Sequence, residues 1–504
     1  MRVIDFIIKT PTNKRYLLIA SMGMVVEFVV FKWLYPFADF FSDSYYYIYG
    51  AATNLDVNIW PIGYSKFLRL FHFITHSDTA LVAFQYFFLE LACLYFFFTF
   101  LYFYRPSKLS ERVLFVLLFF NPLFLYISNY VNSDPLFAAL SMWWFTELIW
   151  IVQRPRGYQI IVQAVLLLMC FTVRNNAYYY PIVAALAFTL SGQLLWRKIT
   201  GALLGIVLII PFVLFTREAA YKLTGARQFS LFTGWQLANN ALYMYGHIQV
   251  DNSKLPTTEA REIDTLARYF YSQVKLSEFE TILNGYEANY FIIDPKAPLK
   301  RYMRHHFRPQ SEQEYIADWG KSSVAYESFG KYLIMHYPFE FAKYFILRNT
   351  RNYFVPPLEK LEVYNRGEDK VDPIAAQWFD YKTNQVATIS KGLQGRILYI
   401  FPIFFALLNF YCLGGIAILL IEKKIQRIGI AINKTILLSG AFLILNMLFC
   451  ITTTIIVLRY EFFPMIICLA LSFLILEKVN KKEELEYGVN IGGSKKKKTL
   501  LAGY

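Results

Sequence analysis

Apolar residues recur along this chain in runs that are too long for the helices or strands of a water-soluble core. A helix needs about 20 mainly apolar residues to cross a bilayer, and several segments reach that length with few interior charges. We therefore predict an all-α polytopic membrane protein with about ten transmembrane helices. The predicted spans are 16–38, 79–104, 113–132, 135–152, 160–174, 177–195, 199–221, 396–421, 435–458 and 461–476.

Lysine and arginine gather before the first predicted span and in every second connection after it. The first four of these basic groups are Arg2 to Arg15, Arg105 to Arg112, Arg154 with Arg156, and Arg197 with Lys198; Lys423 to Arg427 and the C-terminal tail complete the pattern. Cytoplasmic loops carry such an excess of cations. We therefore expect both termini in the cytoplasm and the intervening connections on the outer face.

Two of the outer connections are long. Residues 39–78 form a first outer loop rich in aromatic residues, and the connection from residue 222 is too long to lack structure of its own. We expect that second segment to be a mainly helical extracytoplasmic domain. The chain then divides into an N-terminal transmembrane module, this domain, C-terminal transmembrane helices and a basic cytoplasmic tail, at 1–221, 222–395, 396–476 and 477–504.

Composition agrees with a membrane protein and narrows its functions. Hydrophobic residues make up 56% of the chain and charged residues 17%, whereas soluble domains are about 25% charged. The net charge of +14 follows the loop topology, so nucleic acid is not an expected partner. All five cysteines lie in predicted spans and none forms a Cys-x-x-Cys pair, so neither a disulfide framework nor a zinc site is predicted.

The first outer loop carries two carboxylates among aromatic side chains, directly after the first predicted span. Asp39 and Asp43 are four residues apart, so in a helix both would lie on one face. Partial burial strengthens a carboxylate as a general base, and rings such as that of Tyr46 offer stacking surfaces for a sugar or a polyprenyl chain. The alternative for Asp39 is a helix cap, with the aromatic residues forming an interfacial belt.

Two further outer segments combine turn residues with a candidate functional side chain. The sequence Trp60-Pro-Ile-Gly-Tyr64 predicts a turn before a short amphipathic helix, and Tyr64 is a candidate for substrate contact. Asp134 stands at the start of the fourth predicted span. It either caps that helix or acts as an acid of a metal or phosphate site that faces the first loop.

Two other outer turns each hold one arginine at the end of a span. Arg174 is followed by Asn175, a candidate polar contact, and Arg459 opens the sequence Arg-Tyr-Glu-Phe-Phe-Pro. An arginine in this position can extend to lipid headgroups, but a guanidinium also offers paired donors that match phosphate oxygens. Near the two first-loop carboxylates, these arginines would form a site for an anionic lipid phosphate.

Charged groups elsewhere are weaker candidates. Glu27 and Lys32 lie within the first span, where a charge is costly and needs a partner on another helix. His305 and His306 form a basic patch with neighbouring arginines inside segment 222–395. No acidic or cysteine residue stands beside these histidines, so the patch suits lipid phosphates or an acidic acceptor better than a metal.

The order of these motifs along the chain, and their predicted location on the outer side of the membrane, resemble those of the GT-C superfamily of membrane glycosyltransferases. The most similar group is the family 39-like one, which includes protein O-mannosyltransferases and the aminoarabinose transferase of lipid A. The resemblance rests on Asp39-Phe-Phe-Ser-Asp43-Ser-Tyr, Pro61-Ile-Gly-Tyr64, Ser133-Asp134-Pro-Leu, Arg174-Asn-Asn-Ala and Arg459-Tyr-Glu-Phe-Phe-Pro464. It covers most of residues 1–200 and 435–476 but not segment 222–395. The family usually has an Asp-Glu pair in this loop, so Asp43-Ser44 leaves open which aspartate is the base, and we favour Asp43.

The resemblance implies a donor sugar on polyprenyl phosphate and an extracytoplasmic acceptor, which would be an envelope glycan, a lipid or a protein. The aspartate would deprotonate the acceptor hydroxyl, which attacks the anomeric carbon with inversion, while Arg174 and Arg459 hold the lipid phosphate. This chemistry requires no cofactor, although a divalent cation is compatible with it. The expected location is a bacterial inner membrane, with membrane lipids around the spans and the catalytic site on the outer face.

Other classes of function stay open at this point. A transporter or flippase would place charges near mid-bilayer on broken helices, often with internal repeats, whereas the acids and arginines here stand mainly at the outer ends of spans. An O-antigen ligase or polymerase would instead use the patch from His305 to Arg308, and a structural assembly subunit would use neither site. Substituting Asp43 and His306 separately, with an assay of the glycan products, separates the two enzymes.

Overall fold

The computed structural model of the chain describes residues 2–285, 289–421 and 430–492. Within these ranges the regular elements are helices and no strand is formed, which confirms the predicted all-α fold. The basic residues Lys423, Lys424 and Arg427 and the tail lysines Lys495 to Lys498 lie outside the described residues.

Eight helical stretches of the described chain are long and apolar enough to cross a membrane, as expected of a multi-pass membrane protein. Four of them are single helices, α2 (Pro11–Leu34), α5 (Asp78–Tyr104), α8 (Ser133–Gln153) and α11 (Leu195–Thr224). The others are α6 (Lys108–Phe119) with α7 (Pro122–Asn129), α21 (Leu393–Leu398) with α22 (Phe401–Ile421), α23 (Ile430–Thr453), and the first part of α24 (Leu458–Gly492).

Two predicted spans correspond to shorter helices. Predicted span 160–174 is α9 (Gln159–Val173), and span 177–195 is the 3-10 turn η1 (Asn175–Tyr179) followed by α10 (Tyr180–Leu190). Both α9 and α10 pack against α8 and α11. Fifteen residues of helix rise about 22 Å, less than the roughly 30 Å of a hydrocarbon core. The total of ten transmembrane helices therefore stays a prediction.

The predicted span 113–132 is interrupted in the structure. α6 ends at Phe119 and α7 begins at Pro122, where proline is favoured because the first helical N–H needs no partner. Asn121 caps α7 by accepting a hydrogen bond from the backbone N–H of Leu123 at 3.1 Å. The short helix α7 then ends at Asn129 and places the start of α8 beside the first loop.

The membrane-spanning helices differ in how much of their surface is buried against the rest of the protein. α8 and the first part of α24 are the most buried spans, whereas α2 and α11 keep most of their apolar side chains exposed. Val25, Val29, Leu203 and Val207 are among these exposed residues. Apolar faces of this size are unfavourable in water, so α2 and α11 form the lipid-facing edge of the bundle around a central α8.

Residues 225–354, which we call the loop domain, have a hydrophobic core distinct from that of the bundle. Its centre is α12 (Thr233–Tyr245) against α17 (Glu312–His336), where a Cβ on Gly234 would collide with the carbonyl of Ser323. Val57 and Ile59 of the first loop enter the same core. Its other helices are η2 (Asn252–Lys254), α13 (Thr258–Ser272), α14 (Leu276–Gly285), α15 (Tyr290–Ile293), α16 (Pro298–His306), α18 (Pro338–Phe341), η3 (Ala342–Ile346) and α19 (Leu347–Phe354).

Residues 355–392, which we call the return segment, connect the loop domain to α21. They are mostly irregular, with the short helices η4 (Glu359–Leu361), η5 (Tyr364–Gly367) and α20 (Pro373–Trp378). The N–H of Ile389 donates to the carbonyl of Leu34 at 3.1 Å, and the N–H of Leu458 donates to that of Pro357 at 2.9 Å. Through these hydrogen bonds the return segment contacts both the end of α2 and the start of α24.

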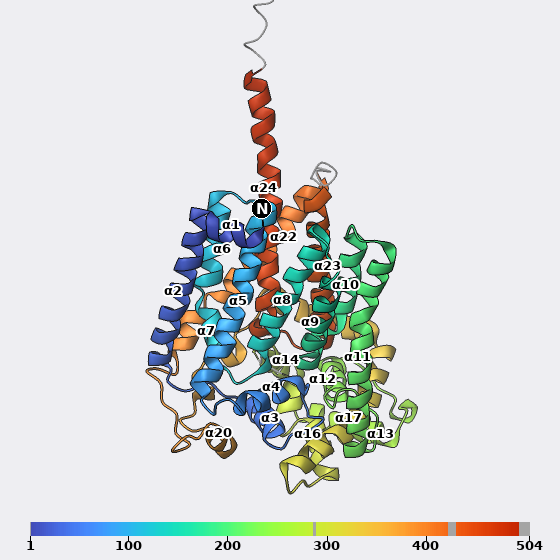
Figure 1. Cartoon of the computed structure of the whole chain (residues 1–504). Coiled ribbons are helices and arrows are strands. Elements are labelled where there is room, and N and C mark those ends of the chain that lie inside the picture. The colour runs from blue at the N-terminus through green and yellow to red at the C-terminus, as the bar shows by residue number, and fades with distance from the viewer. Residues whose placement is uncertain (1, 286–288, 422–429, 493–504) are drawn as a thin grey trace, which may run out of the picture.

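The two ends of the bundle differ in what they carry. α1 (Val3–Lys9) and the projecting end of α24 lie at one end, whereas α3 (Ser42–Ala52), α4 (Gly63–His72), α12, α16, α17 and α20 gather at the other (Figure 1). The first loop, the loop domain and the return segment therefore meet at a single end of the molecule, where the candidate site is formed.

Candidate functional site

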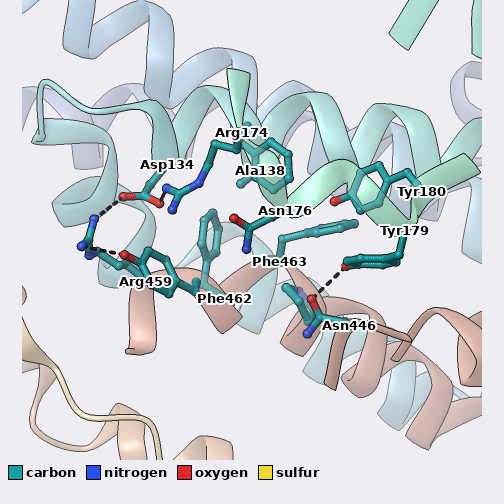
Figure 2. A pocket seen from close by; sticks show the side chains of 13 residues that line it. Asp134, Ala138, Arg174, Asn176, Tyr179, Tyr180, Asn446, Arg459, Phe462 and Phe463 are labelled. Carbon is teal, nitrogen blue, oxygen red and sulfur yellow. Dashed lines mark hydrogen bonds and ion pairs between the residues drawn. The ribbon is translucent and has the colours of Figure 1, made fainter. Parts of the chain in front are cut away.

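Asp134 links two arginines that come from different helices. Asn132 caps α8 by accepting the N–H of Ser133 at 2.5 Å, and Asp134 follows in the first turn. A guanidinium nitrogen of Arg174, at the end of α9, donates to Oδ1 of Asp134, and Nη1 of Arg459, at the start of α24, donates to Oδ2 at 3.0 Å (Figure 2). All three charged side chains are largely buried. Asp134 therefore fixes both guanidinium groups.

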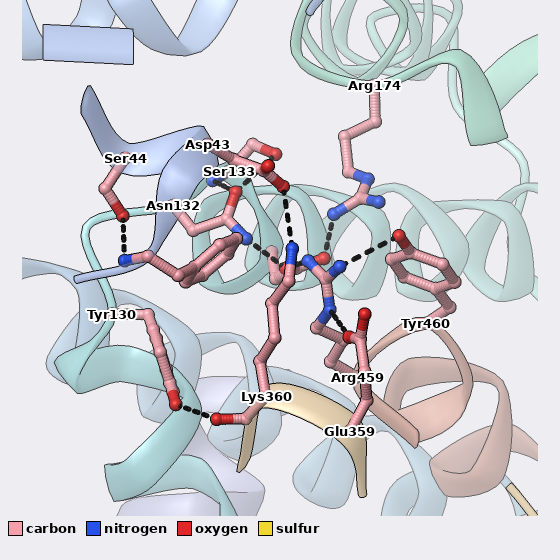
Figure 3. A network of polar contacts seen from close by, with 12 residues as sticks. Asp43, Ser44, Tyr130, Asn132, Ser133, Arg174, Glu359, Lys360, Arg459 and Tyr460 are labelled. Atoms are coloured by element: carbon pink, nitrogen blue, oxygen red, sulfur yellow. Dashed lines mark hydrogen bonds and ion pairs between the residues drawn. The ribbon is translucent and has the colours of Figure 1, made fainter. Parts of the chain in front are cut away.

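Arg459 also contacts the return segment. Its Nε donates to Oε2 of Glu359 at 3.3 Å, and its Nη2 donates to the hydroxyl of Tyr460 at 3.0 Å (Figure 3). Glu359 has a φ of 52°, in the left-handed region that is unfavourable for a residue with a Cβ. Such strain persists only where surrounding contacts hold it and is frequent at functional sites. In this protein the strained residue is the one whose carboxylate contacts Arg459.

Asp43 lies in the first turn of α3. Its Oδ1 accepts a hydrogen bond from the hydroxyl of Ser42 at 3.3 Å, and its Oδ2 lies 3.6 Å from Nζ of Lys360 (Figure 3). The side chain is 15% exposed and lines a cavity. An entering hydroxyl group can therefore reach the carboxylate.

Asp39 occupies a different environment, although the sequence places it four residues from Asp43. α3 begins at Ser42, so the expectation that both carboxylates share one helix face is wrong. Asp39 is buried and accepts the N–H of Asn365 at 2.8 Å, while its own backbone pairs with Tyr130. Burial raises the pKa of Asp39 to about 7. Asp39 thus joins the first loop to the return segment and has no exposed face for a substrate.

Two adjoining cavities surround the charged groups. The first, which we call the Asp43 cavity, has a volume of about 240 Å³ and is lined by Asp43, Arg459 and Lys360 together with aromatic residues. The second, the Arg174 cavity, has a volume of about 370 Å³ and a more apolar lining. The two share the lining residues Ile59, Trp60, Phe232 and Tyr460. Their combined volume lies within the range of cavities that bind small ligands, about 300–1,000 Å³.

The remaining candidates from the sequence separate into two groups. Tyr46 lines the Asp43 cavity, where burial raises its pKa and keeps its hydroxyl protonated, and Asn175 lines the Arg174 cavity. Tyr64 is fully buried and donates to Oε1 of Gln85 at 2.7 Å. It therefore packs α4 against α5 instead of facing a substrate.

Three charged residues of the Asp43 cavity were not among the candidates from the sequence. Glu359 and Lys360 come from the return segment, and Lys300 comes from the first turn of α16. Each stands in a stretch where charged residues are frequent. The positive φ of Glu359 is a structural signal of its role, and no local sequence pattern marks it.

The basic patch of the loop domain lies apart from these groups. His306 is exposed and its Nε2 lies 2.8 Å from Oε2 of Glu262, while Arg301 packs over the ring of Tyr269. Inside α2, Glu27 accepts a hydrogen bond from the hydroxyl of Tyr86 at 3.2 Å. These charges therefore have partners of their own and take no part in the cavity.

No cluster of three or more His, Cys, Asp or Glu side chains that could hold a metal ion is found in the described part of the chain. The cysteines Cys93, Cys170, Cys412, Cys450 and Cys468 are buried and form no disulfide. The charged groups that line the two cavities are the carboxylates, guanidinium groups and ammonium groups described above.

Comparison of the chain with family models, with curated proteins and with solved structures finds no match. The function is therefore argued from the geometry and charge of the site itself.

Proposed function

We propose that this protein is a membrane glycosyltransferase that transfers a sugar from a polyprenyl-phosphate donor to an acceptor hydroxyl. The observation that carries this proposal is that Asp43 and Arg459 line one cavity, with Arg174 in the adjoining one. A carboxylate that can take a proton thus stands near two guanidinium groups that can bind a phosphate. The resemblance of the same residues to GT-C motifs points to the same chemistry.

In this reaction Asp43 acts as the general base. It takes the proton of the acceptor hydroxyl, and the oxygen attacks the anomeric carbon of the donor sugar. The bond from that carbon to the phosphate oxygen breaks, and the polyprenyl phosphate leaves with the electron pair. The product is a glycoside with inverted configuration, and Asp43 afterwards releases its proton to water. No redox step or co-reactant is needed.

Arg174 and Arg459 stabilise the negative charge that grows on the leaving phosphate. Donors that are fixed in place before the reaction stabilise such charge without the cost of reorientation. Asp134 holds both guanidinium groups in place and is therefore a positioning residue. Asp134 binds one nitrogen of each guanidinium group, and a phosphate that binds Arg459 would replace its contacts with Glu359 and Tyr460.

The Arg174 cavity suits the lipid part of the donor. Its lining includes the apolar residues Leu237, Phe449 and Tyr178, and the side chain of Tyr178 is exposed at the edge of the bundle. A polyprenyl chain that leaves by this route would enter the bilayer beside α9 and α23. This arrangement explains why such an enzyme is embedded in the membrane.

The distribution of basic loops supports a site on the outer face. In the proposed orientation both termini are cytoplasmic, and the first loop, the loop domain and the return segment face the periplasm of a bacterial cell. The acceptor is then an envelope glycan, a lipid or a protein on that side. A labelling reagent that cannot cross the membrane should react with a cysteine placed at exposed Asn54 but not with one placed at exposed Lys9.

The function itself is tested by deleting the gene and comparing the envelope glycans, lipids and proteins of the two strains by mass spectrometry. We expect one envelope molecule of the deletion strain to be lighter than its counterpart in the parent strain by the mass of one sugar. Expression of the unmodified chain should restore that mass, and expression of an Asp43→Asn variant should not. Identical product masses in the two strains would overturn the proposal.

A further inference from the structure

Lys300 lines the Asp43 cavity from the loop domain, whereas Arg459 lines it from the start of α24. Its ammonium group lies 4.5 Å from the ring centre of Trp319 and 5.1 Å from that of Trp235. It also donates a hydrogen bond to the hydroxyl of Tyr315 at 3.1 Å. Aromatic faces attract a cation, so this box of rings holds Lys300 at the cavity wall.

The ion pairs around the cavity leave Lys300 in a distinct position. Arg459 contacts Asp134 and Glu359, and Lys360 contacts Asp43. Within the part of the chain that the structure describes, Lys300 makes no ion pair with a carboxylate. It is thus a cation whose charge is balanced only by ring faces and a neutral hydroxyl.

The surroundings of Lys300 are costly for its charge. Burial and, to a smaller extent, the nearby guanidinium group of Arg304 together lower the pKa of Lys300 to about 8. An anion that entered the cavity would remove part of this cost, because an opposite charge nearby favours the charged form. Lys300 therefore presents a positive charge at the wall of the cavity.

We propose that Lys300 and its aromatic box form a subsite for an acidic group, a carboxylate or a phosphate, that is carried by a saccharide acceptor. This inference rests on the proposed function, and it names the substrate class of the same cavity. The donor phosphate already has Arg174 and Arg459 on the bundle side. Lys300 stands on the loop-domain side, so it contacts the second substrate.

The rings around Lys300 also suit a saccharide. Tyr46 and Tyr315 stack with their ring centres 6.0 Å apart, and Phe232 and Trp319 stack at 6.1 Å. Ring faces at a cavity wall offer apolar surface to the C–H face of a sugar. A subsite with one cation and several ring faces therefore selects an acidic sugar over a neutral sugar and over a free anion.

The test is a tryptophan-fluorescence titration of the purified full-length protein in detergent, since Lys300 lies against two tryptophans. The probes are methyl glucuronide, glucose 6-phosphate, methyl glucoside and inorganic phosphate. We expect at least one of the two acidic sugars to bind more tightly than both methyl glucoside and inorganic phosphate. The affinity should fall as the pH rises above about 8, because the ammonium group then loses its proton.

Lys300→Gln should weaken binding of the acidic sugar about tenfold or more, since a hydrogen bond to a charged group contributes about 1.5–3 kcal/mol. Lys300→Arg should retain most of it. The matched control is Lys321→Gln, because Lys321 also lies over a ring, that of Phe307, but is paired with Asp318 at 3.0 Å. Equal binding by wild type and Lys300→Gln, no preference for acidic sugars, or equal affinity for inorganic phosphate would overturn the inference.

This titration does not depend on turnover, so its failure differs from failure of the proposed function. An Asp43→Asn variant should still bind the acidic sugar while losing transfer. If the deletion strain lacks a sugar and Lys300→Gln still binds the probes as wild type does, the proposed glycosyltransferase function is supported and the proposed acidic subsite is wrong.

Discussion

Nη1 of Arg459 donates to Oδ2 of Asp134 at 3.0 Å, and this contact joins the first turn of α24 to the first turn of α8. Arg174 binds the other carboxylate oxygen of Asp134 from the end of α9. Three helices are thus held together by one buried carboxylate. In the proposed function, the stability of the site and the orientation of its arginines for phosphate therefore depend on the same residue.

Replacement of that carboxylate should destabilise the protein. Asp134→Asn leaves two largely buried guanidinium groups without their common partner, and removal of one member of a buried ion pair costs about 3–5 kcal/mol. We expect a lower melting temperature in detergent and a weaker affinity for the donor. The exposed pair of Asp56 with Lys66 provides the control, because Asp56→Asn should change the melting temperature little. A wild-type melting temperature for Asp134→Asn would contradict this account.

Asp43→Asn should abolish sugar transfer while the fold is retained. A general base contributes about 10²–10⁴-fold to a rate, so we expect a decrease of at least about a hundredfold in turnover, measured as release of polyprenyl phosphate. Donor binding should change little, because the phosphate contacts are elsewhere. Asp39→Asn separates the two aspartates, since it should keep turnover within a few-fold. A greater loss with Asp39→Asn than with Asp43→Asn would make Asp39 the base.

Glu359→Gln should strengthen binding of the lipid phosphate. Glu359 now accepts a hydrogen bond from Nε of Arg459 at 3.3 Å and so competes with an entering phosphate for the guanidinium group. The amide keeps the size of the side chain but removes the competing charge. We expect inhibition by a short-chain polyprenyl phosphate at a severalfold lower concentration than in wild type. Unchanged or weaker inhibition would show that Glu359 does not compete.

Asp39 should give the stability of the protein a dependence on pH. Burial raises the pKa of Asp39 from 3.8 to about 7, so between these values the folded protein holds a proton that the unfolded chain has released. The corresponding stabilisation is lost as the pH rises from about 4 through 7. Asp39→Asn stays neutral and can still accept the N–H of Asn365.

The measurement for Asp39 is thermal unfolding in detergent at several pH values. The melting temperature of wild type should fall between about pH 4 and pH 7, and that of Asp39→Asn should fall less. Asp56→Asn should keep the wild-type dependence, because Asp56 is exposed. Parallel curves for wild type and Asp39→Asn would refute the assignment of this pH dependence to Asp39.

Gly63 should be required for the packing of the first loop. A Cβ at this position would overlap the backbone carbonyl of Thr172 in α9, and backbone atoms cannot move away as a flexible side chain can. We expect Gly63→Ala to lower the melting temperature and the turnover together, because the loop that carries Asp43 is displaced. Gly157→Ala is the matched control, since no atom lies within 4 Å of its Cβ position. Equal melting temperatures for the two variants would exclude this role.

The sequence by itself determined the class of the fold, and it predicted a shared site at the outer ends of the spans. Lipid requires long apolar helices, so the spans are visible as local runs of residues. Polar residues are costly inside such runs, which is why Asp43, Asp134, Arg174 and Arg459 stand out at the ends of helices. Their short motifs carry enough information to predict one shared site.

The tertiary structure alone decided how those residues pair and which of them face a cavity. Asp39 and Asp43 are both aspartates of the first loop, and the sequence does not distinguish their environments. The fold buries Asp39 under the return segment and leaves Asp43 at a cavity wall. Glu359, Lys360 and Lys300 join the site through segments with no distinctive local pattern. The physical reason is that burial and ion pairing depend on neighbours brought from distant parts of the chain, whereas hydrophobic patterning is a property of adjacent residues.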